Sequence, residues 1–460
     1  METIDGETID AGTIDGAPTL RSRSFDRTEW FREARFGLFL HFGAYSVLEG
    51  EEWARSIDRL SIEQYQLAVD RFHPDSFDPE KWADDAVAAG MKYAILTAKH
   101  HDGFCLFDSA LTDYSTMHNG FGRDLVREFL DAFRSRGLRV GLYYSLLDWH
   151  HPDYPAYDDE HHPHRGDAEW ANHQPEFDNY LDYMYGQIEE LCSNYGKLDI
   201  LWFDFSYGSM TSETWRAAKV VRMVRSHQPD VLIDNRLETS GGGFGSIVTS
   251  QPTEWAGDFV SPEQLVPAEG IRNYAGAPVP WEACFTHNNH WGYYRGDNAF
   301  KPARMLVRKL VEIVSKGGNL LLNVGPRPDG TWPPQSVAEF AAVGEWLETN
   351  GESMFGAGIA EFPKPEWGFY TQNGNSVYAH VLEPPVGPLA LTGIDPGRIG
   401  SMRLLATGQP LRRAAVWLTD AYPYVTFVSF GDSPTFTYSL PDDIDTVIEI
   451  VLADHKAERA

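Results

Sequence analysis

One aspartate in the sequence is flanked by aromatic residues and closes an apolar run. Asp204 ends the run LDILWFDF, beside Trp202, Phe203 and Phe205. Aromatic rings can stack on the apolar faces of a sugar, and a carboxylate can attack or stabilise an oxocarbenium-like carbon. In the structural alternative, Asp204 caps the helix that follows its strand. The residue types therefore suggest sugar chemistry and leave the cap open.

Further polar residues follow the ends of other apolar runs. They are His41; His100, His101 and Asp102; Tyr143, Tyr144 and Asp148; Asp234 and Arg236; and Glu282. In a barrel of parallel strands, catalytic residues come from the carboxyl ends of several strands. A barrel that served only as a scaffold would not carry reactive side chains at six strand ends. The set therefore indicates an active site.

The adjacent histidines His100 and His101 raise the alternative of a metal centre. Adjacent strand residues point to opposite faces, so at most one faces the barrel axis unless the strand has ended. Zinc also needs a third ligand at a defined spacing, and none is evident. Neutral imidazoles that bind hydroxyl groups account better for the pair. A second histidine group, His150, His151, His161, His162 and His164, is expected in a solvated surface loop.

Positioning these residues requires the alternation of strands and helices that the sequence shows. Strand-like apolar runs cover 36–43, 93–99, 138–145, 198–205, 231–236, 281–286 and 319–325. Helical periodicity covers 61–72, 123–136, 177–195, 213–227, 302–316 and 336–349. Strands that are apolar throughout are buried on both faces, as in a parallel sheet, and no Gly-x-Gly-x-x-Gly follows the first of them. We therefore expect an α/β fold with a (β/α)8-like, TIM-type barrel over residues 25–355.

The two ends of the chain differ from this central part. Residues 1–24 are an acidic, Gly-punctuated repeat of Thr-Ile-Asp-Gly, too short and polar to fold alone, and are expected to be disordered. From about residue 356 to 460 helical periodicity disappears. Short β-rich runs at 376–382, 414–418, 424–430 and 446–452 are separated by Pro, Gly and Asp turns. They predict a C-terminal β-sandwich.

Composition narrows the classes of partner. The formal net charge is −29, from 38 basic and 67 acidic residues, so nucleic acid and anionic membrane surfaces would be repelled. The sequence shows no secretory leader and no apolar run long enough to span a bilayer, which predicts a cytoplasmic protein with no membrane partner. Three distant cysteines argue against a disulfide framework. A homo-oligomer is compatible with the sequence.

Six motifs, in order along residues 28–355, resemble those of the family 29 glycoside hydrolases, the α-L-fucosidases. They are WFREARFGLFLHFGAYSV with Glu52-Trp53, TAKHHDGFCLF, GLYYSLLDW, LWFDF, Trp281-Glu282 with Trp291-Gly292-Tyr293, and GGNLLLNVGPRPDG. Each motif is weak alone, but the ordered set is specific. The family's architecture, a catalytic barrel followed by a β-sandwich, matches the organisation predicted above.

The resemblance implies a retaining double displacement with Asp204 as the nucleophile. Its acid/base partner would lie about 5–5.5 Å away and act first as an acid and then as a base. The match places this partner at Glu263, with Asp258 next and Glu254 and Glu282 as further candidates. An alternative makes Glu263 an ordinary acidic residue in the first turn of a helix begun by Ser261-Pro262.

The resemblance also implies a set of substrate-binding residues. Those that would hold fucose hydroxyl groups are His41, Glu52, His100 and His101; others that line the same subsite are Tyr144, Trp202 and Arg236; the surface for the C5 methyl group is Phe39 and Trp291. An apolar patch suits a 6-deoxy sugar but discriminates only modestly against an analogue with an extra hydroxyl. Phe42 stands where the family has Trp, and His290 where it has a small residue.

Together these observations predict a retaining, exo-acting α-L-fucosidase with no metal and no organic cofactor. Its substrate would be a small molecule or glycan that carries terminal α-L-fucose. Two alternatives remain at this point: a metal-dependent barrel hydrolase, and a non-catalytic glycan-binding barrel. An α-galactosidase-like preference would follow if the methyl-accepting patch were altered.

Overall fold

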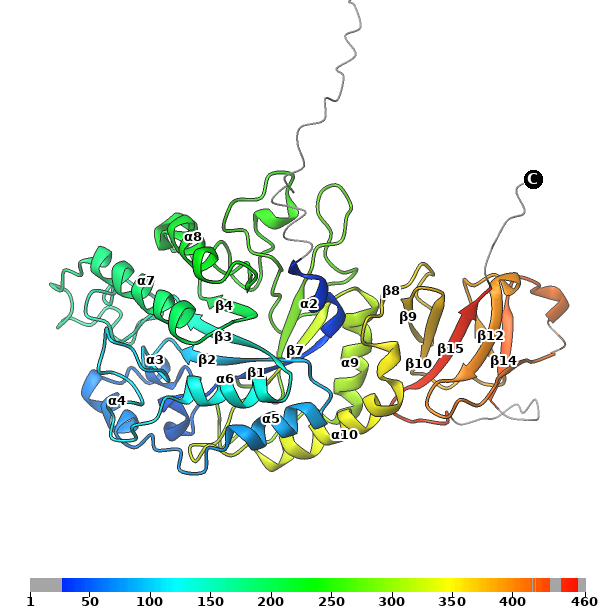
Figure 1. Ribbon diagram of the computed structural model, residues 1–460, viewed down its shortest axis with the longest axis horizontal. Helices are drawn as coiled ribbons and strands as arrows, with labels where there is room; N and C mark the ends of the chain where they lie inside the picture. Colours follow the sequence, from blue (N-terminus) through cyan, green and yellow to red (C-terminus); the bar gives the residue numbers. More distant parts are fainter. Residues whose placement is uncertain (1–26, 416, 418, 431–439, 454–460) are drawn as a thin grey trace, which may run out of the picture.

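The computed structural model describes residues 27–415, 417, 419–430 and 440–453. A curled parallel sheet surrounded by helices is followed by two antiparallel sheets at the other end of the elongated molecule (Figure 1). The expected tail of residues 1–24 lies outside the described residues. Within them, no helix is long and apolar enough to cross a membrane.

The parallel sheet has seven strands in the order β5-β4-β3-β2-β1-β7-β6. The strands are β1 Phe36–Leu40, β2 Tyr93–Lys99, β3 Arg139–Ser145, β4 Ile200–Asp204, β5 Leu232–Ile233, β6 Glu282–Thr286 and β7 Asn319–Val324. Residues 259–263 lie between the two edge strands: Phe259 forms a parallel bridge to Asp234, and Val260 and Glu263 form bridges to Trp281 and Cys284. This extended segment occupies the place of an eighth strand. The predicted (β/α)8-like barrel is confirmed.

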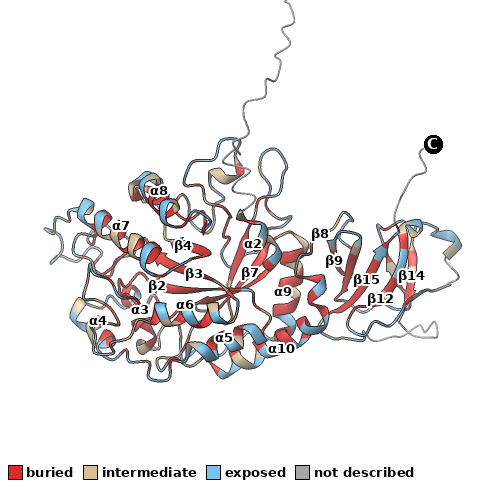
Figure 2. Cartoon of the chain, in the orientation of Figure 1, coloured by how far each residue is buried: buried red, intermediate tan, exposed pale blue. Residues whose placement is uncertain are grey.

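Helices cover the outside of the barrel. They are α2 Glu29–Ala34, α3 Ala54–Ile57, α4 Ile62–Val69, α5 Pro79–Ala88, α6 Leu125–Ser135, α7 Phe177–Asn194, α8 Ala217–His227, α9 Ala303–Ser315 and α10 Pro334–Asn350. Ser61 and Gln64 form a capping box at α4, and the Asp124 side chain caps α6. Gly137 follows α6 at φ +75°, a conformation that suits glycine. Figure 2 shows the buried faces of these helices turned toward the sheet.

Alternation along the strands separates an inner from an outer core. The inner cluster contains Phe39, Tyr143, Ile200, Trp202 and Leu321. The outer cluster, against the helices, contains the neighbouring positions Leu38, Tyr144, Leu201, Phe203 and Leu320. Because successive strand residues point to opposite faces, this register decides which side chains can reach the barrel's open end.

The C-terminal sheets pack face to face as a sandwich. One sheet has the order β12-β15-β10-β9-β8 and the other β11-β14-β13. The strands are β8 Gly358–Ile359, β9 Gly368–Asn373, β10 Ser376–Val381, β11 Leu389–Leu391, β12 Ile399–Leu404, β13 Arg412–Arg413, β14 Thr426–Ser429 and β15 Thr446–Leu452. The predicted run at 414–418 is wrong as a strand among its described residues. The division at about residue 355, which falls between α10 and β8, stays a proposal.

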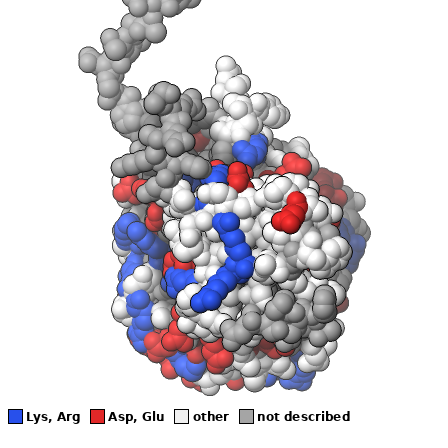
Figure 3. Space-filling model, turned by 90° about the vertical axis from the view of Figure 1, so that its right-hand side faces the viewer, with Lys and Arg blue, Asp and Glu red and all other residues white. Residues whose placement is uncertain are grey.

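The larger sheet of the sandwich packs on both faces. Val377 of β10 and Ile448 of β15 belong to the sandwich core. Their neighbours Tyr378 and Val447 belong to the core of the barrel, and α9 packs against β9. On the face at the sandwich end, acidic and basic side chains are interspersed (Figure 3).

A buried ion pair lies between the barrel wall and α7. The Lys99 ammonium, fully buried, lies 2.9 Å from Asp148 Oδ2 and 4.4 Å from the centre of the Tyr144 ring. Burial opposes the charge on Asp148, but Lys99 more than offsets it and lowers the pKa of the carboxyl to about 2. The backbone N–H groups of His150 and His151 also donate to this carboxylate.

We expect Lys99→Met to lower the free energy of unfolding by about 3–5 kcal/mol, because it leaves a buried carboxylate without its counter-charge. Urea denaturation measures the loss, and adding Asp148→Asn should recover part of it. Since the pKa of Asp148 lies below its unfolded value of about 3.9, its contribution is complete above about pH 4 and is lost as the pH falls toward 2. Equal stability of Lys99→Met and the unaltered protein would contradict this account.

Candidate active site

A pocket of about 220 Å³ opens at the carboxyl ends of the barrel strands. Its lining comes from all sides of the barrel: Phe39, His41, Trp53, His100, His101, Tyr143, Trp202, Asp204, Phe205, Ser206, Tyr207, Arg236, Ser240, Gly241, Glu263, Cys284 and Trp291. Small pockets with mostly aromatic walls and a few convergent polar groups are typical of ligand sites. Nine of the eleven residues predicted as catalytic or substrate-binding meet here as a single group of side chains, His100 and His101 among them.

Two carboxylates in this pocket share one guanidinium. Arg236 Nη1 donates to Asp204 Oδ1 at 2.9 Å, and Arg236 Nη2 donates to Glu263 Oε2 at 3.2 Å. The Tyr143 hydroxyl donates to the other Asp204 oxygen at 2.9 Å. The side chain of Asp204 is 15% exposed and that of Glu263 is 38% exposed, so Asp204 lies deeper. The arrangement puts two acidic groups on one guanidinium in the pocket, with Glu263 nearer the solvent.

The segment that carries Glu263 also holds Arg236 in place. Arg236 Nε donates to Ser261 Oγ at 2.9 Å, and Nη2 donates to the Ser261 carbonyl at 3.0 Å. The Asn235 side-chain oxygen accepts from both Ser261 N–H and Oγ–H. No helix begins at Ser261-Pro262: Glu263 lies on the extended segment beside β6. The alternative in which it opens a helix is therefore wrong.

Burial and charge act in opposite directions on Asp204. Burial raises the pKa of the Asp204 carboxyl to about 6, with Glu263 adding to the rise, while Arg236 and the Tyr143 hydrogen bond favour the ionised form. The two carboxylates in turn raise the pKa of Arg236, which stays charged. Asp204 therefore gains its charge near neutral pH instead of well below it.

The backbone is strained at both carboxylates. Phe205, directly after Asp204, has φ +82°, and Gln264, directly after Glu263, has φ +52°. A non-glycine residue in this region costs about 1–3 kcal/mol and persists only where its surroundings impose it. Strained positions of this kind gather at functional sites, so they support a role for both neighbours.

Two histidines of the pocket have their tautomers fixed by their partners. His41 Nδ1 lies 2.7 Å from Asn323 Oδ1, while the Asn323 amide nitrogen donates to the Trp291 carbonyl. His101 Nδ1 lies 2.7 Å from Ser145 Oγ, whose own hydrogen goes to the Leu147 carbonyl. Nδ1 must therefore donate in both rings. Nε2 is left as an acceptor, as binding to a hydroxyl group requires.

Burial keeps these imidazoles neutral. It lowers the pKa of His41 to about 3, and it holds the pKa values of His100 and His101 well below the usual range. His100 and His101 both line the pocket because β2 has ended at Lys99 before them. Buried His100 Nδ1 has no hydrogen-bond partner, which leaves a polar atom for a ligand.

Aromatic rings form the closed end. Phe39 packs against Trp202 with ring centres 5.3 Å apart and against Trp291 at 5.9 Å. Arg236 lies over the Trp202 ring at 4.8 Å. Of the predicted substrate-binding residues, His41, His100, His101, Trp202, Arg236, Phe39 and Trp291 thus line the pocket together with both predicted catalytic residues.

Tyr144 is a correction. Its ring lies in the outer core and its hydroxyl donates to Gln187 Oε1 of α7 at 2.8 Å, away from the pocket. The neighbouring Tyr143 points inward and contacts Asp204. Strand alternation turns only one of these two adjacent tyrosines toward the inside of the barrel. The register of β3, which the sequence does not reveal, decides that it is Tyr143.

Four other predicted acidic residues lie outside the lining. Glu52 is buried and accepts a hydrogen bond from Gly292 N–H at 2.7 Å. Glu282 accepts from the side chains of Tyr93 and Trp202 inside the barrel, where burial raises its pKa to about 8. Buried Asp258 is paired with Arg27 and Arg225, and Glu254 with Arg222 on the surface. The geometry therefore leaves Glu263 as the candidate beside Asp204.

The histidine-rich loop differs from the expected solvated loop. His162 and His164 are buried, and His164 stacks on Trp170 with ring centres 4.5 Å apart. His150 stacks on Tyr114 at 3.6 Å. Among the residues that the structure describes, no three His, Cys, Asp or Glu side chains are grouped as a metal site would need. The cysteines Cys105, Cys192 and Cys284 are buried free thiols.

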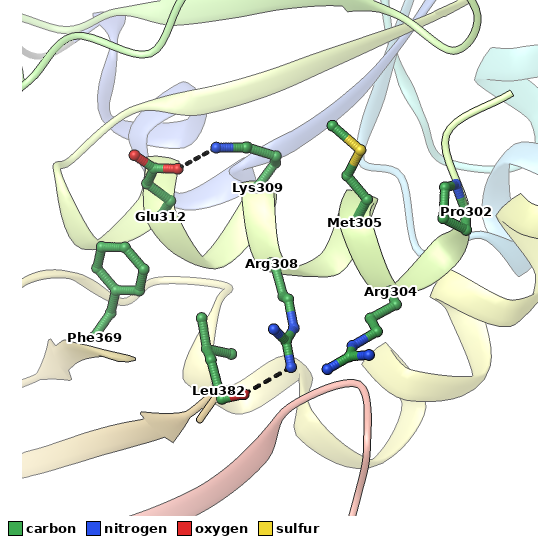
Figure 4. Close-up of a pocket in the computed structure, with 8 residues that line it drawn as sticks. All are labelled: Pro302, Arg304, Met305, Arg308, Lys309, Glu312, Phe369 and Leu382. Atoms are coloured by element: carbon green, nitrogen blue, oxygen red, sulfur yellow. Dashed lines mark hydrogen bonds and ion pairs between the residues drawn. The ribbon is translucent and has the colours of Figure 1, made fainter. Parts of the chain in front are cut away.

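A second hollow, of about 390 Å³, lies on α9 at its junction with the sandwich (Figure 4). The Arg308 side chain donates to the carbonyls of Leu382 and Ile444, and Lys309 pairs with Glu312. The Arg308 bonds connect the barrel to the sandwich, and the Lys309 pair lies within α9. The hollow is best explained as part of that junction.

Several lining residues were not predicted to be site residues, although Phe205 and Trp53 are direct neighbours of the predicted Asp204 and Glu52. Trp53, Phe205, Ser206, Tyr207, Ser240, Gly241 and Cys284 were not singled out as site residues. Gly241 belongs to the GGGFG run and lies so close to Arg236 that a Cβ atom there would meet Nη2 at 2.6 Å. Such a close approach explains the glycine at position 241.

Comparisons with known proteins agree with the geometry. A family model described as α-L-fucosidase matches residues 17–352. Plasma α-L-fucosidase of Homo sapiens is 30% identical over 413 residues, which cover 83% of this chain and 82% of that protein. The structure of α-L-fucosidase isoenzyme 1 from Paenibacillus thiaminolyticus is 51% identical, covers 94% of this chain and 100% of its own, and superimposes with a TM-score of 0.90.

A further relative was captured during its reaction. A family 29 α-L-fucosidase from Bacteroides thetaiotaomicron, solved as a trapped covalent intermediate with 2-fluoro-fucosyl fluoride, is 26% identical, with a TM-score of 0.77 over 96% of this chain and 98% of that one. The family model spans well over half of the chain, and the Bacteroides protein shares the barrel and its C-terminal sheets. The chain belongs to the α-L-fucosidase family of glycoside hydrolases, family 29.

Proposed function

We propose that the protein is a retaining, exo-acting α-L-fucosidase. The observation that carries the proposal is the pair of carboxylates, Asp204 and Glu263, bridged by Arg236 in a pocket lined by aromatic rings. Retaining glycosidases need two carboxyl groups about 5–5.5 Å apart, a nucleophile and an acid/base. The covalent intermediate trapped in the Bacteroides relative supports the same chemistry here.

In this mechanism Asp204 attacks the anomeric carbon. Arg236 and Tyr143 orient its two oxygens, and Arg236 favours the ionised form. Glu263, nearer the solvent, protonates the leaving oxygen and later removes a proton from the water that opens the fucosyl–Asp204 ester. A non-catalytic glycan-binding protein would have no need of both carboxylates. For the metal-dependent alternative, the described residues contain no group of three His, Cys, Asp or Glu side chains that could hold the metal.

The rest of the pocket suits fucose. The neutral Nε2 atoms of His41 and His101 accept hydrogen bonds from sugar hydroxyl groups. Phe39 and Trp291 provide the apolar surface for the C5 methyl group. The small volume, closed at one end by aromatic rings, fits a single terminal sugar and gives exo action.

A panel of aryl glycosides tests the proposal. We expect hydrolysis of the aryl α-L-fucoside, with α-L-fucose as the first anomer seen by NMR, and rates at least about tenfold lower on the α-D-galactoside. Chelator should leave the rate unchanged. First appearance of β-L-fucose, or no turnover of any glycoside in the panel, would overturn the proposal.

The acidic limb of the pH–rate profile should follow Asp204. Only its ionised form attacks, and its pKa is raised to about 6, so kcat/KM should rise with pH through about 6. Because Arg236 favours the charged form, Arg236→Gln should move this limb to higher pH. An acidic limb that keeps its position in Arg236→Gln would contradict the electrostatic role of the guanidinium.

A further inference from the structure

His290 lies between two carboxylates that belong to two different loops. Its Nδ1 atom is 2.7 Å from Asp297 Oδ2 in its own loop, and its Nε2 atom is 3.6 Å from Glu51 Oε2 in the loop before α3. Its ring also meets the Tyr294 ring edge to face, with centres 4.7 Å apart. The side chain is 23% exposed and lies outside the pocket lining. Its neighbour in the sequence, Trp291, does line the pocket, so His290 can act on a ligand through that residue.

The hydrogen bonds of Asp297 fix one proton on the His290 ring. Asp297 also accepts the backbone N–H groups of Asn289 at 2.7 Å and of Ala299 at 2.9 Å. Burial would raise the pKa of the Asp297 carboxyl, but these N–H groups and the His290 ring lower it below its usual value. Asp297 is therefore ionised and accepts a hydrogen bond from Nδ1–H. The other ring nitrogen, Nε2, is left to face Glu51.

Contacts between the two loops lie on both sides of Trp291. After it, the Gly292 N–H donates to buried Glu52 at 2.7 Å. Before it, His290 approaches Glu51. The family resemblance leads us to expect a small residue at position 290, and a small side chain could make neither carboxylate contact. His290 therefore supplies this chain with a second anchor for the loop that carries Trp291.

The position of the Trp291 ring matters because it forms part of the apolar surface of the pocket. It packs against Phe39 with ring centres 5.9 Å apart and against His41 at 5.0 Å. Under the proposed function this surface accepts the C5 methyl group. A gap of only 0.5–1 Å already forfeits about a quarter to a half of a van der Waals contact. A small displacement of the indole would thus weaken the methyl contact and leave the hydroxyl contacts of the sugar in place.

We infer that His290 is a positioning residue that holds Trp291 against the C5 methyl group of fucose, and so determines how strongly the enzyme prefers fucose to a sugar without that methyl group. The inference rests on the proposed function and adds a residue that the substrate does not touch. Burial of one methyl group corresponds to roughly a fourfold change in an equilibrium constant. Loss of part or all of this contact should therefore change the preference by about twofold to fourfold.

The experiment compares two aryl glycosides with the same leaving group in the full-length protein. One is the α-L-fucoside, and the other is the pentoside that keeps every fucose hydroxyl group but carries hydrogen in place of the C5 methyl group. The measured quantity, the methyl preference, is kcat/KM for the fucoside divided by kcat/KM for the pentoside. His290→Ala should lower the methyl preference by about twofold to fourfold. Its rate on the pentoside should stay close to that of the unaltered protein, which also shows that the variant is folded.

Further variants separate positioning from general damage to the protein. Glu51→Ala removes the other side of the contact between the loops and should lower the methyl preference in the same range. In a Trp291→Ala background the preference should already be low, and His290→Ala should lower it no further, because the effects of coupled residues do not add. His227→Ala is the matched control: this partly exposed imidazole pairs with Glu189 outside the pocket lining, and its loss should leave the preference unchanged.

An unchanged methyl preference in either His290→Ala or Glu51→Ala would overturn the positioning role, as would a further fall in the Trp291→Ala background. A preference near one in the unaltered protein, or equal losses on the two glycosides, would overturn it as well. All of these results leave fucosidase activity itself standing, because the unaltered protein still hydrolyses the fucoside. Failure of the unaltered protein on the fucoside would instead overturn the proposed function and this inference with it.

Discussion

Asp204→Ala should lose turnover of an aryl α-L-fucoside by about 10⁴-fold or more, the scale of loss when a catalytic nucleophile is removed. The side chain that forms the covalent bond is then absent, and Arg236 and Tyr143 lose the carboxylate that they orient. The space left at the anomeric carbon admits a small anion. Initial rates with and without azide measure both effects.

Azide provides the control for this variant. We expect it to restore part of the rate and to yield fucosyl azide, because an external nucleophile replaces the missing carboxylate while Glu263 stays in place. Loss of activity through unfolding would show no such rescue. A variant that hydrolyses the fucoside at near-normal rates would contradict the assignment of Asp204.

Glu263→Gln should have the second-largest effect, and its size should depend on the leaving group. General acid catalysis contributes about 10²–10⁴-fold, so hydrolysis of an unactivated fucoside should fall by that amount. A substrate whose leaving group needs no protonation should lose far less in the first step. The alkaline limb of the pH–rate profile should disappear, because no proton remains for the limb to report. Rates on matched activated and unactivated fucosides measure this dependence.

Glu254→Gln is the matched control, since Glu254 is paired with Arg222 on the surface and lies outside the pocket. It should keep both the rates and the alkaline limb. If Glu263→Gln kept its alkaline limb, or lost activity equally on both kinds of fucoside, the acid/base role would belong to another group.

Much of the fold follows from the sequence because buried parallel strands leave a strong pattern. The runs at 93–99 and 446–452 coincide with β2 and β15. The α6 stripe from Leu125 to Phe133 is buried as periodicity predicts. α5, β9 and β12 were not predicted, although α5 is longer than α4 and β9 and β12 are as long as β10, for all of which the sequence has a matching run. The segment 259–263 was missed as well, because its place in the barrel depends on partners distant in the chain.

The site residues likewise fall into those that the strand pattern places and those that it does not. Asp204 and Arg236 end predicted strands, so their meeting follows from barrel geometry. Glu263 came from the family resemblance alone, since its surrounding loop has no periodicity. Tyr144 also came from the family resemblance, but it is Tyr143 that reaches Asp204, because neighbouring residues of a strand point to opposite faces. Tyr207 lines the pocket and is held by a hydrogen bond to Asp159, and no local pattern encodes such a contact.

The central claim is that Asp204 bonds to fucose during turnover. The most direct measurement is intact-protein and peptide mass spectrometry after incubation with 2-fluoro-fucosyl fluoride, in which the fluorine at C2 slows release of the intermediate. The account predicts one fluorofucosyl group per chain, on the peptide that contains Asp204, and none in Asp204→Ala. A label on any other residue, or no label on a protein that hydrolyses α-L-fucosides, would contradict it.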